Sequence, residues 1–264
     1  MLLKNKNAII YGAGGAVGGT IARAYAREGA RLFLAGRTLA KVDAVAKEII
    51  AKGGAVETAQ LDALDEEAIE RHAMDVVRKA GRIDISFNAI GVHDTQALSG
   101  GSLVELDAEQ FYAPIKALGA SYFLTARLAA RRMVPHKSGV IMTVTTLQSR
   151  KGVRMVGGYG PAQAVKDALT RNLSAELAPL GIRVLGLRPQ AMPEVETTRK
   201  AFEPRAKAMG MTWEQFEKSL ASTTHSQRLM TLAEMANVAA FMASDGASGV
   251  TGTNVNLTMG TLDD

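Results

Sequence analysis

A glycine-rich segment near the N-terminus has the composition and the position of a phosphate-binding loop. YGAGGAVGG follows a short apolar run, Asn7–Tyr11, that is typical of a strand, and it leads into a helical pattern. Its glycines permit a tight turn and a close approach of the backbone to a pyrophosphate, which then meets a helix N-terminus. The spacing departs from GxGxxG because Val17 takes the third position of that register. The predicted dinucleotide-binding residues of this loop are Gly12, Gly14, Gly15, Val17 and Gly18.

The end of the next expected strand distinguishes between two dinucleotides. Sites for NAD place an acidic residue there, where it binds the ribose 2′-hydroxyl. Here the segment reads LFLAGRT, with Arg37 and no acid between Gly29 and Thr38. A guanidinium matches a 2′-phosphate, and no carboxylate is present to repel one. The sequence therefore predicts NADP(H) as the cofactor.

Short apolar runs alternate with helical patterns along the chain, and these elements must position the loop. The expected strands are 7–11, 31–35, 56–61, 83–88, 140–145, 183–187 and 254–257, and the expected helices are 16–28, 39–52, 65–80, 107–133, 159–178 and 232–242. Such alternation is typical of a parallel sheet with helices on both faces. The strands are nearly continuous in apolar residues, as in strands buried on both faces. We predict one α/β domain over residues 1–264, with a Rossmann-type, doubly wound sheet of seven parallel strands.

One long segment, residues 190–229, lies outside this alternation. It is rich in charged residues, Met and Thr, and it follows the carboxyl end of a strand, where open α/β sheets bind ligands. We predict that it covers the substrate; an insertion that covers only the core is the alternative. Within the expected helix at 107–133, Pro114 is predicted to disturb the helix.

The composition excludes several kinds of chemistry. The chain has no cysteine, which removes disulfides, thiolate nucleophiles and cysteine-ligated metals, and its four histidines show no ligand spacing. The net charge of +5 is dispersed and aromatic residues make up 5%, so no nucleic-acid surface is expected. No stretch approaches about 18 apolar residues, and the N-terminal apolar run is too short for a signal segment. We expect a cytoplasmic protein with a small-molecule substrate and with no metal and no membrane partner.

Several motifs resemble those of the short-chain dehydrogenase/reductase superfamily, in the same order along nearly the whole chain. YGAGGAVG is similar to the family's TGxxxGxG, FNAIG to its NNAG, and YGPAQAVKDALTRNLSAEL to its catalytic helix. AQLDALD, GIRVLGLRPQ and VTGTNVNLTMG resemble three further family segments. The resemblance implies a homo-oligomer, either a tetramer or a dimer. It also implies further cofactor contacts, at Asp62 and Ala63 for adenine, at Asn88, Ala89 and Gly91 for the ribose side, and at Tyr159, Lys166, Pro189 and Met192.

The family's catalytic tetrad of Asn, Ser, Tyr and Lys is only partly matched. Ala117 stands where the asparagine is expected, and Thr146 takes the serine position, thirteen residues before Tyr159. Threonine keeps a hydroxyl that can form a hydrogen bond with a substrate carbonyl. The lysine expected four residues after Tyr159 is replaced by Gln163, which carries no charge.

Lys166 offers a cation on the helix face of Tyr159. At about 100° per residue, positions four and seven residues after Tyr159 are rotated from it by about 40° and about −20°. Gln163 and Lys166 therefore share its face, and helical side chains lean toward the N-terminus. We predict that Lys166 reaches the cofactor ribose; a solvated helix lysine is the alternative. The Tyr-x6-Lys spacing resembles the enoyl-acyl-carrier-protein reductase branch, although Ser149 stands where that branch has a second tyrosine.

Together with the resemblance, these residues predict an oxidoreductase that transfers hydride between NADPH and a carbonyl substrate, such as a ketone or a 3-oxoacyl-like compound. Tyr159 would donate a proton to the developing oxyanion, Thr146 would bind the substrate oxygen, and Lys166 or the oxidised nicotinamide would lower the pKa of Tyr159. Two alternatives stay open: an enoyl reductase that uses Tyr159 and Lys166, and a catalytically silent NADP-binding protein. His93, in the loop after the fourth expected strand, is a further candidate for substrate contact.

Overall fold

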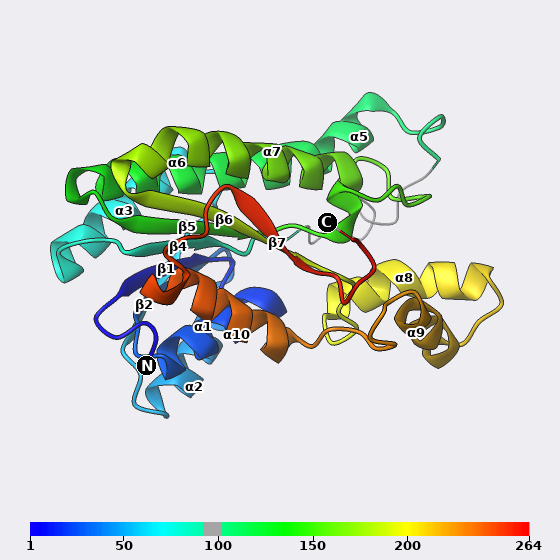
Figure 1. Ribbon diagram of the computed structural model, residues 1–264, viewed down its shortest axis with the longest axis horizontal. Coiled ribbons are helices and arrows are strands. Elements are labelled where there is room, and N and C mark those ends of the chain that lie inside the picture. Colours follow the sequence, from blue (N-terminus) through cyan, green and yellow to red (C-terminus); the bar gives the residue numbers. More distant parts are fainter. Residues whose placement is uncertain (92–101, 264) are drawn as a thin grey trace.

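The computed structural model describes residues 1–91 and 102–263, and Figure 1 shows its strands in one sheet with helices against both faces. The strand order is β3-β2-β1-β4-β5-β6-β7, and every pair of neighbours is parallel. The predicted Rossmann-type sheet of seven parallel strands is thus confirmed. Winding reverses between β1 and β4, and a sheet of this kind binds ligands beyond the carboxyl ends of its strands at such a switch point.

Most of the strands are buried, whereas the two edge strands are only partly so. The strands are β1 Asn7–Tyr11, β2 Arg31–Gly36, β3 Val56–Gln60, β4 Ile85–Asn88, β5 Gly139–Val144, β6 Ile182–Pro189 and β7 Thr253–Leu257. The helices are α1 Ala16–Arg27, α2 Leu39–Ile50, α3 Glu66–Ala80, α5 Ala108–Ile115, α6 Ser121–Met133, α7 Tyr159–Leu177, α8 Glu196–Ala208, α9 Trp213–Ser222 and α10 Leu232–Ala243. The prediction of strands buried on both faces is wrong for the two edge strands. The residues of β3 are half-buried or exposed, and only two of the five residues of β7 are buried. In the described part of the chain, no helix is both long enough and apolar enough to cross a bilayer.

Two hydrophobic cores, one on each face of the sheet, specify the strand register. Helices α1, α2 and α10 cover one face and α3, α6 and α7 the other (Figure 1). Ile10 belongs to the first core and its neighbour Ile9 to the second, because successive strand residues point to opposite faces. A shift of one residue in the pairing register would move the side chains of one core into the other. The two cores therefore fix the register, and with it the residues that lie at the carboxyl edge of the sheet.

The helix expected at 107–133 is divided by a π-helical turn. Asp107 and Gln110 form a capping box that begins α5, and Pro114 lies inside that helix. Residues Lys116–Ala120 then form the π turn, and α6 follows it directly. The irregularity beside Pro114 agrees with the predicted disturbance, since proline lacks the amide that a regular helix needs.

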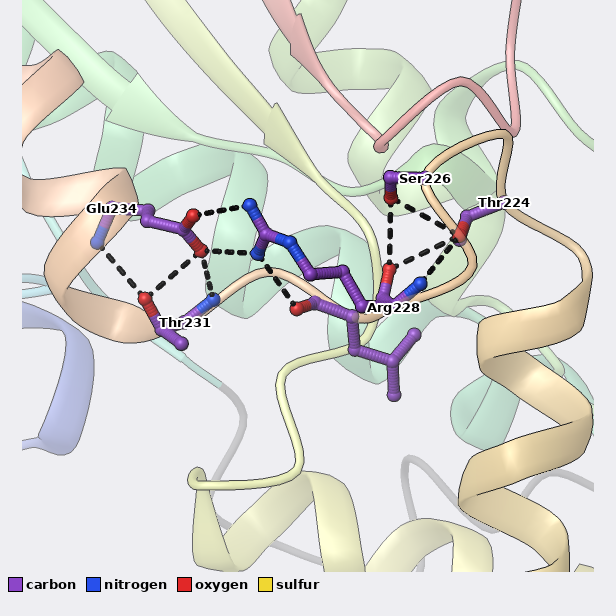
Figure 2. A network of polar contacts seen from close by, with 6 residues as sticks. Thr224, Ser226, Arg228, Thr231 and Glu234 are labelled. Atoms are coloured by element: carbon purple, nitrogen blue, oxygen red, sulfur yellow. Dashed lines mark hydrogen bonds and ion pairs between the residues drawn. The ribbon is translucent and has the colours of Figure 1, made fainter.

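The segment at 190–229 contains α8 and α9, which lie beyond the carboxyl end of β6 (Figure 1). Both ends of the segment are tied to the start of α10. At one end, Glu194 accepts a hydrogen bond from the first amide of α10 at 2.8 Å. At the other end, Figure 2 shows Arg228 binding both carboxylate oxygens of Glu234, which also accepts hydrogen bonds from the amide and the hydroxyl of Thr231. These contacts place α8 and α9 beside the carboxyl edge of the sheet.

Candidate active site

A cleft of about 170 Å³ lies at the carboxyl ends of β4, β5 and β6. Its described lining carries no charged side chain. The larger apolar side chains of this lining are Val17, Ile90, Leu118, Val144, Val156, Met192, Val195 and Phe202. The polar side chains are Thr145, Thr146, Gln148, Tyr159, Gln163, Gln190, Thr197 and Thr198. A mainly apolar cleft with a few convergent polar groups is typical of a small-molecule site.

Three of the predicted catalytic residues, Tyr159, Thr146 and Gln163, come together in this cleft. Burial raises the pKa of the Tyr159 hydroxyl to about 12, and the adjacent side chains of Gln163 and Thr146 partly oppose that rise. Thr146 Oγ1 and Gln163 Oε1 are buried, and neither has a hydrogen-bond partner among the described residues. Because buried polar atoms are rarely left unpaired, these two oxygens are positioned to bind a ligand.

Close packing of α7 against the turn after β5 brings these residues together. Thr146 has extended backbone and precedes the short 3-10 turn Leu147–Ser149. A Cβ added to Gly160, in the first turn of α7, would lie 3.3 Å from the Gln148 carbonyl oxygen. Gly158 caps the same helix, and a side chain there would overlap the Phe111 carbonyl. Glycine at position 160 therefore lets the start of α7, and Tyr159 with it, pack against the turn after β5, and glycine at position 158 lets it pack against α5.

Lys166 lies deeper than the cleft. Its side chain is 1% exposed, its Nζ donates a hydrogen bond to the Val144 carbonyl at 2.5 Å, and Nζ lies 5.9 Å from the centre of the Tyr122 ring. Burial lowers the pKa of Lys166 to about 7, and the charge of Asp167 partly opposes that change. The alternative of a solvated helix lysine is therefore wrong. Lys166 is not part of the cleft lining, and its contact with a ribose stays a prediction.

A buried ion pair accompanies Lys166. Arg188 of β6 and Asp167 of α7 are joined at 2.8 Å, with 4% and 3% of their side chains exposed. Arg188 Nε also donates a hydrogen bond to Ser149 Oγ at 3.1 Å. Sequence reasoning missed this pair, although a second arginine near the end of a largely apolar strand was a signal for it.

The glycine loop fits a phosphate. Gly12 has φ of +80°, and a Cβ there would lie 2.7 Å from the Ala89 carbonyl oxygen. Side chains at Gly14 and Gly18 would press against α2 and against the loop itself. Gly15 is the N-cap of α1 and makes no side-chain cap, so no capping side chain occupies the end of the helix that favours an anion. The loop thus has the close backbone approach that a dinucleotide pyrophosphate needs.

Other predicted cofactor residues lie along the same edge of the sheet. Arg37 is exposed directly after β2, and its carbonyl accepts a hydrogen bond from Gln60 Nε2 at 3.0 Å. Asp62 is exposed after β3, where its carboxylate accepts a hydrogen bond from the Leu64 amide, and Ala63 is buried beside it. Those that line the cleft are Val17, Ala89, Gly91, Pro189 and Met192.

One predicted cofactor residue, Asn88, is not part of the cleft lining. Asn88 is buried, and its amide donates a hydrogen bond to Thr125 of α6 at 3.0 Å, so its side chain faces that helix. His93 lies outside the described residues. Within the described ranges, no three His, Asp or Glu side chains gather as metal ligands.

Sequence reasoning missed several cleft residues. Leu118 comes from the π turn, Gln148 and Val156 from the loop between β5 and α7, and Phe202 from α8. Irregular loops have no periodicity, so their inward side chains carry no sequence signal. Only the position of residues 190–229, after a strand end, pointed to that segment.

Comparisons with known proteins cover nearly all of the chain. A family model described as Enoyl-(Acyl carrier protein) reductase matches residues 12–261. The uncharacterised oxidoreductase YxbG of Bacillus subtilis is 30% identical over 253 residues, which are 96% of this chain and 89% of that protein. The peroxisomal 2,4-dienoyl-CoA reductase of Rattus norvegicus is 30% identical over 252 residues, 95% of this chain and 82% of that protein. A structure of 7α-hydroxysteroid dehydrogenase complexed with NADH and 7-oxo glycochenodeoxycholic acid matches with a TM-score of 0.86 and 26% identity, over 99% of this chain and 96% of that one.

Proposed function

Because this chain belongs to the short-chain dehydrogenase/reductase superfamily, we propose that it is an NADP(H)-dependent oxidoreductase acting on a carbonyl compound. The observation that carries the proposal is the meeting of Tyr159, Thr146 and Gln163 in an apolar cleft. A bound nicotinamide cofactor would supply the hydride. The uncharged lining favours a substrate whose reacting part is neutral and largely apolar.

In this proposal Tyr159 protonates the substrate oxygen. Its raised pKa keeps the hydroxyl protonated at neutral pH, as a general acid requires. Thr146 Oγ1, which has no partner among the described residues, donates a hydrogen bond to the same oxygen. Gln163 Oε1 accepts a hydrogen bond from a ribose hydroxyl of the cofactor, at the position of the family's lysine.

The cofactor preference rests on Arg37. It is exposed immediately after β2, and the stretch from Gly29 to Thr38 contains no carboxylate. NAD sites bind the ribose 2′-hydroxyl through an acid at this point, whereas a guanidinium suits a 2′-phosphate. Lys41 is also exposed one helical turn along α2. We therefore propose NADP(H) as the cofactor.

A panel of substrates tests the activity. NADPH binding is measured by fluorescence, and NADPH oxidation is followed with linear and cyclic ketones, a 7-oxo steroid and a 3-oxoacyl thioester. We expect turnover of at least one carbonyl class and a loss of roughly 100-fold or more in Tyr159→Phe with unchanged NADPH affinity. Tight NADPH binding without turnover of any compound would overturn the proposal in favour of a silent NADP-binding protein.

An enoyl reductase is the second candidate. It is favoured by the family model that matches residues 12–261 and by the similarity to the rat 2,4-dienoyl-CoA reductase. The same panel distinguishes it when 2-enoyl and 2,4-dienoyl thioesters are included. Oxidation of NADPH by these thioesters, with none by the matched 3-oxoacyl thioester, would establish reduction of a carbon–carbon double bond instead.

A further inference from the structure

Two buried side chains hold the segment that carries Thr146. Lys166 Nζ donates a hydrogen bond to the Val144 carbonyl, two residues before Thr146. Arg188 Nε donates a hydrogen bond to Ser149 Oγ, three residues after Thr146. The segment from Val144 to Ser149 is thus held at both ends by side chains from beneath the cleft.

The two holding groups form one unit. Asp167 follows Lys166 in α7, and its carboxylate is paired with Arg188 at 2.8 Å. The side chains of all three residues are almost completely buried. Removing charged groups from water is costly, so the hydrogen bonds that this cluster makes are important for it, and two of them end on the segment. The second carboxylate oxygen of Asp167, Oδ1, has no partner among the described residues.

The segment needs this support. The last bond that ties it to the sheet joins the Thr145 amide to the Leu187 carbonyl, and beyond that it forms only a single 3-10 turn. The Thr146 hydroxyl lies close enough to Tyr159 to lower its pKa, but it forms no close hydrogen bond with a described residue. Its position therefore depends on the backbone on either side.

We propose that Lys166 and Arg188 are positioning residues that brace the Val144–Ser149 segment and so aim the Thr146 hydroxyl at the substrate oxygen. This gives Lys166 a task that does not involve the cofactor ribose. The bracing itself is independent of any reaction, whereas its catalytic consequence rests on the proposed function.

Hydrogen–deuterium exchange tests the brace without a substrate. Ser149→Ala removes the acceptor of Arg188 and leaves the buried ion pair intact, and Lys166→Met removes the bond to Val144. Ser174→Ala is the matched control. It removes a comparable side-chain hydrogen bond, of 2.8 Å to Thr251, and Ser174 lies on α7 as Lys166 does. We expect several-fold faster exchange in peptides covering residues 144–150 for the first two variants and no change there for the control. Unchanged exchange in both test variants would overturn the brace, whether or not the protein reduces any carbonyl.

A double-mutant cycle tests the catalytic consequence, using the carbonyl compound turned over in the panel. A lost hydrogen bond of about 1 kcal/mol corresponds to a roughly fivefold fall in kcat for Ser149→Ala. Because this variant acts through Thr146, it should have almost no further effect in a Thr146→Val background. NADPH affinity should stay unchanged in Ser149→Ala and in Lys166→Met. An equal fall in both backgrounds, or weaker NADPH binding in Lys166→Met, would overturn the positioning role.

Discussion

At the scale of single residues, the acid–base behaviour of Tyr159 depends on the neutral side chain four positions later. Burial raises the pKa of Tyr159 to about 12, and Gln163 supplies no charge to counter it. Carbonyl reduction uses the protonated hydroxyl, which dominates at every pH well below that value. Alcohol oxidation needs the phenolate. As long as the pH is well below the pKa, the phenolate fraction increases tenfold for each unit by which the pH rises. We predict oxidation rates that rise about tenfold per unit from pH 7 to 9 and reduction rates that change little. Initial rates in both directions measure this.

Gln163→Lys is the informative variant for that profile. It introduces the charge that the family carries at this position and should lower the pKa of Tyr159. The rise in oxidation rate should therefore move to lower pH. A flat oxidation profile in the unmodified protein would contradict the assignment of Tyr159 as the acid and base.

Arg37 is expected to select the cofactor. Arg37→Asp removes a charge-assisted contact to the 2′-phosphate, worth about 1.5–3 kcal/mol, and introduces repulsion. NADPH should bind at least roughly tenfold more weakly, while NADH binding should be retained or improved. Fluorescence titrations of both cofactors measure this, and Lys47→Asp, the same charge change on an exposed part of α2, is the control. Equal losses in the two variants would point to a general charge effect.

At the scale of elements, the sequence predicted what periodicity encodes. Continuous apolar runs located the strands, and their parallel arrangement brought Thr146 and Tyr159 to one edge of the sheet. The two edge strands were the exceptions, since neither VETAQ in β3 nor TNVNL in β7 is a continuous apolar run. The partner of Lys166 could not be predicted, because its acceptor is a backbone carbonyl and every residue has one.

Helix α8 is expected to recognise the substrate. Phe202 lines the cleft, and its ring lies 5.9 Å from that of Phe216 in α9. Phe202→Ala should raise the KM for an apolar carbonyl substrate about tenfold, because a large apolar contact is lost, and should leave NADPH affinity unchanged. Trp213→Ala is the matched control, since Trp213 also packs on Phe216 but does not line the cleft. Equal KM changes would show that α8 acts only as structural cover.

At the scale of the whole molecule, we expect a homo-oligomer. Phe123 of α6 is 40% exposed, and a large apolar side chain on a helix surface suits a subunit contact. Phe123→Glu should shift the mass measured by light scattering toward the monomer, because a charge would be buried at the interface. Met74→Glu, at an exposed position of α3, is the control. A monomeric mass for the unmodified protein would contradict the expectation.

The buried lysine also affects the stability of the whole fold. The pKa of Lys166 is about 7 in the folded protein and about 10.5 in the unfolded chain. Between these values the unfolded chain binds more protons, so this group makes the free energy of unfolding increase as pH rises from 7 toward 10. Lys166→Met lacks the group, and all other titrations cancel in the difference between the two proteins. The free energy of unfolding is measured in urea at pH 7, 8 and 9, at one fixed protein concentration. The unmodified protein's value minus the variant's should increase by about 1 kcal/mol per pH unit. A constant difference would mean that Lys166 keeps its ordinary pKa when folded, which is incompatible with an amine buried beneath the cleft.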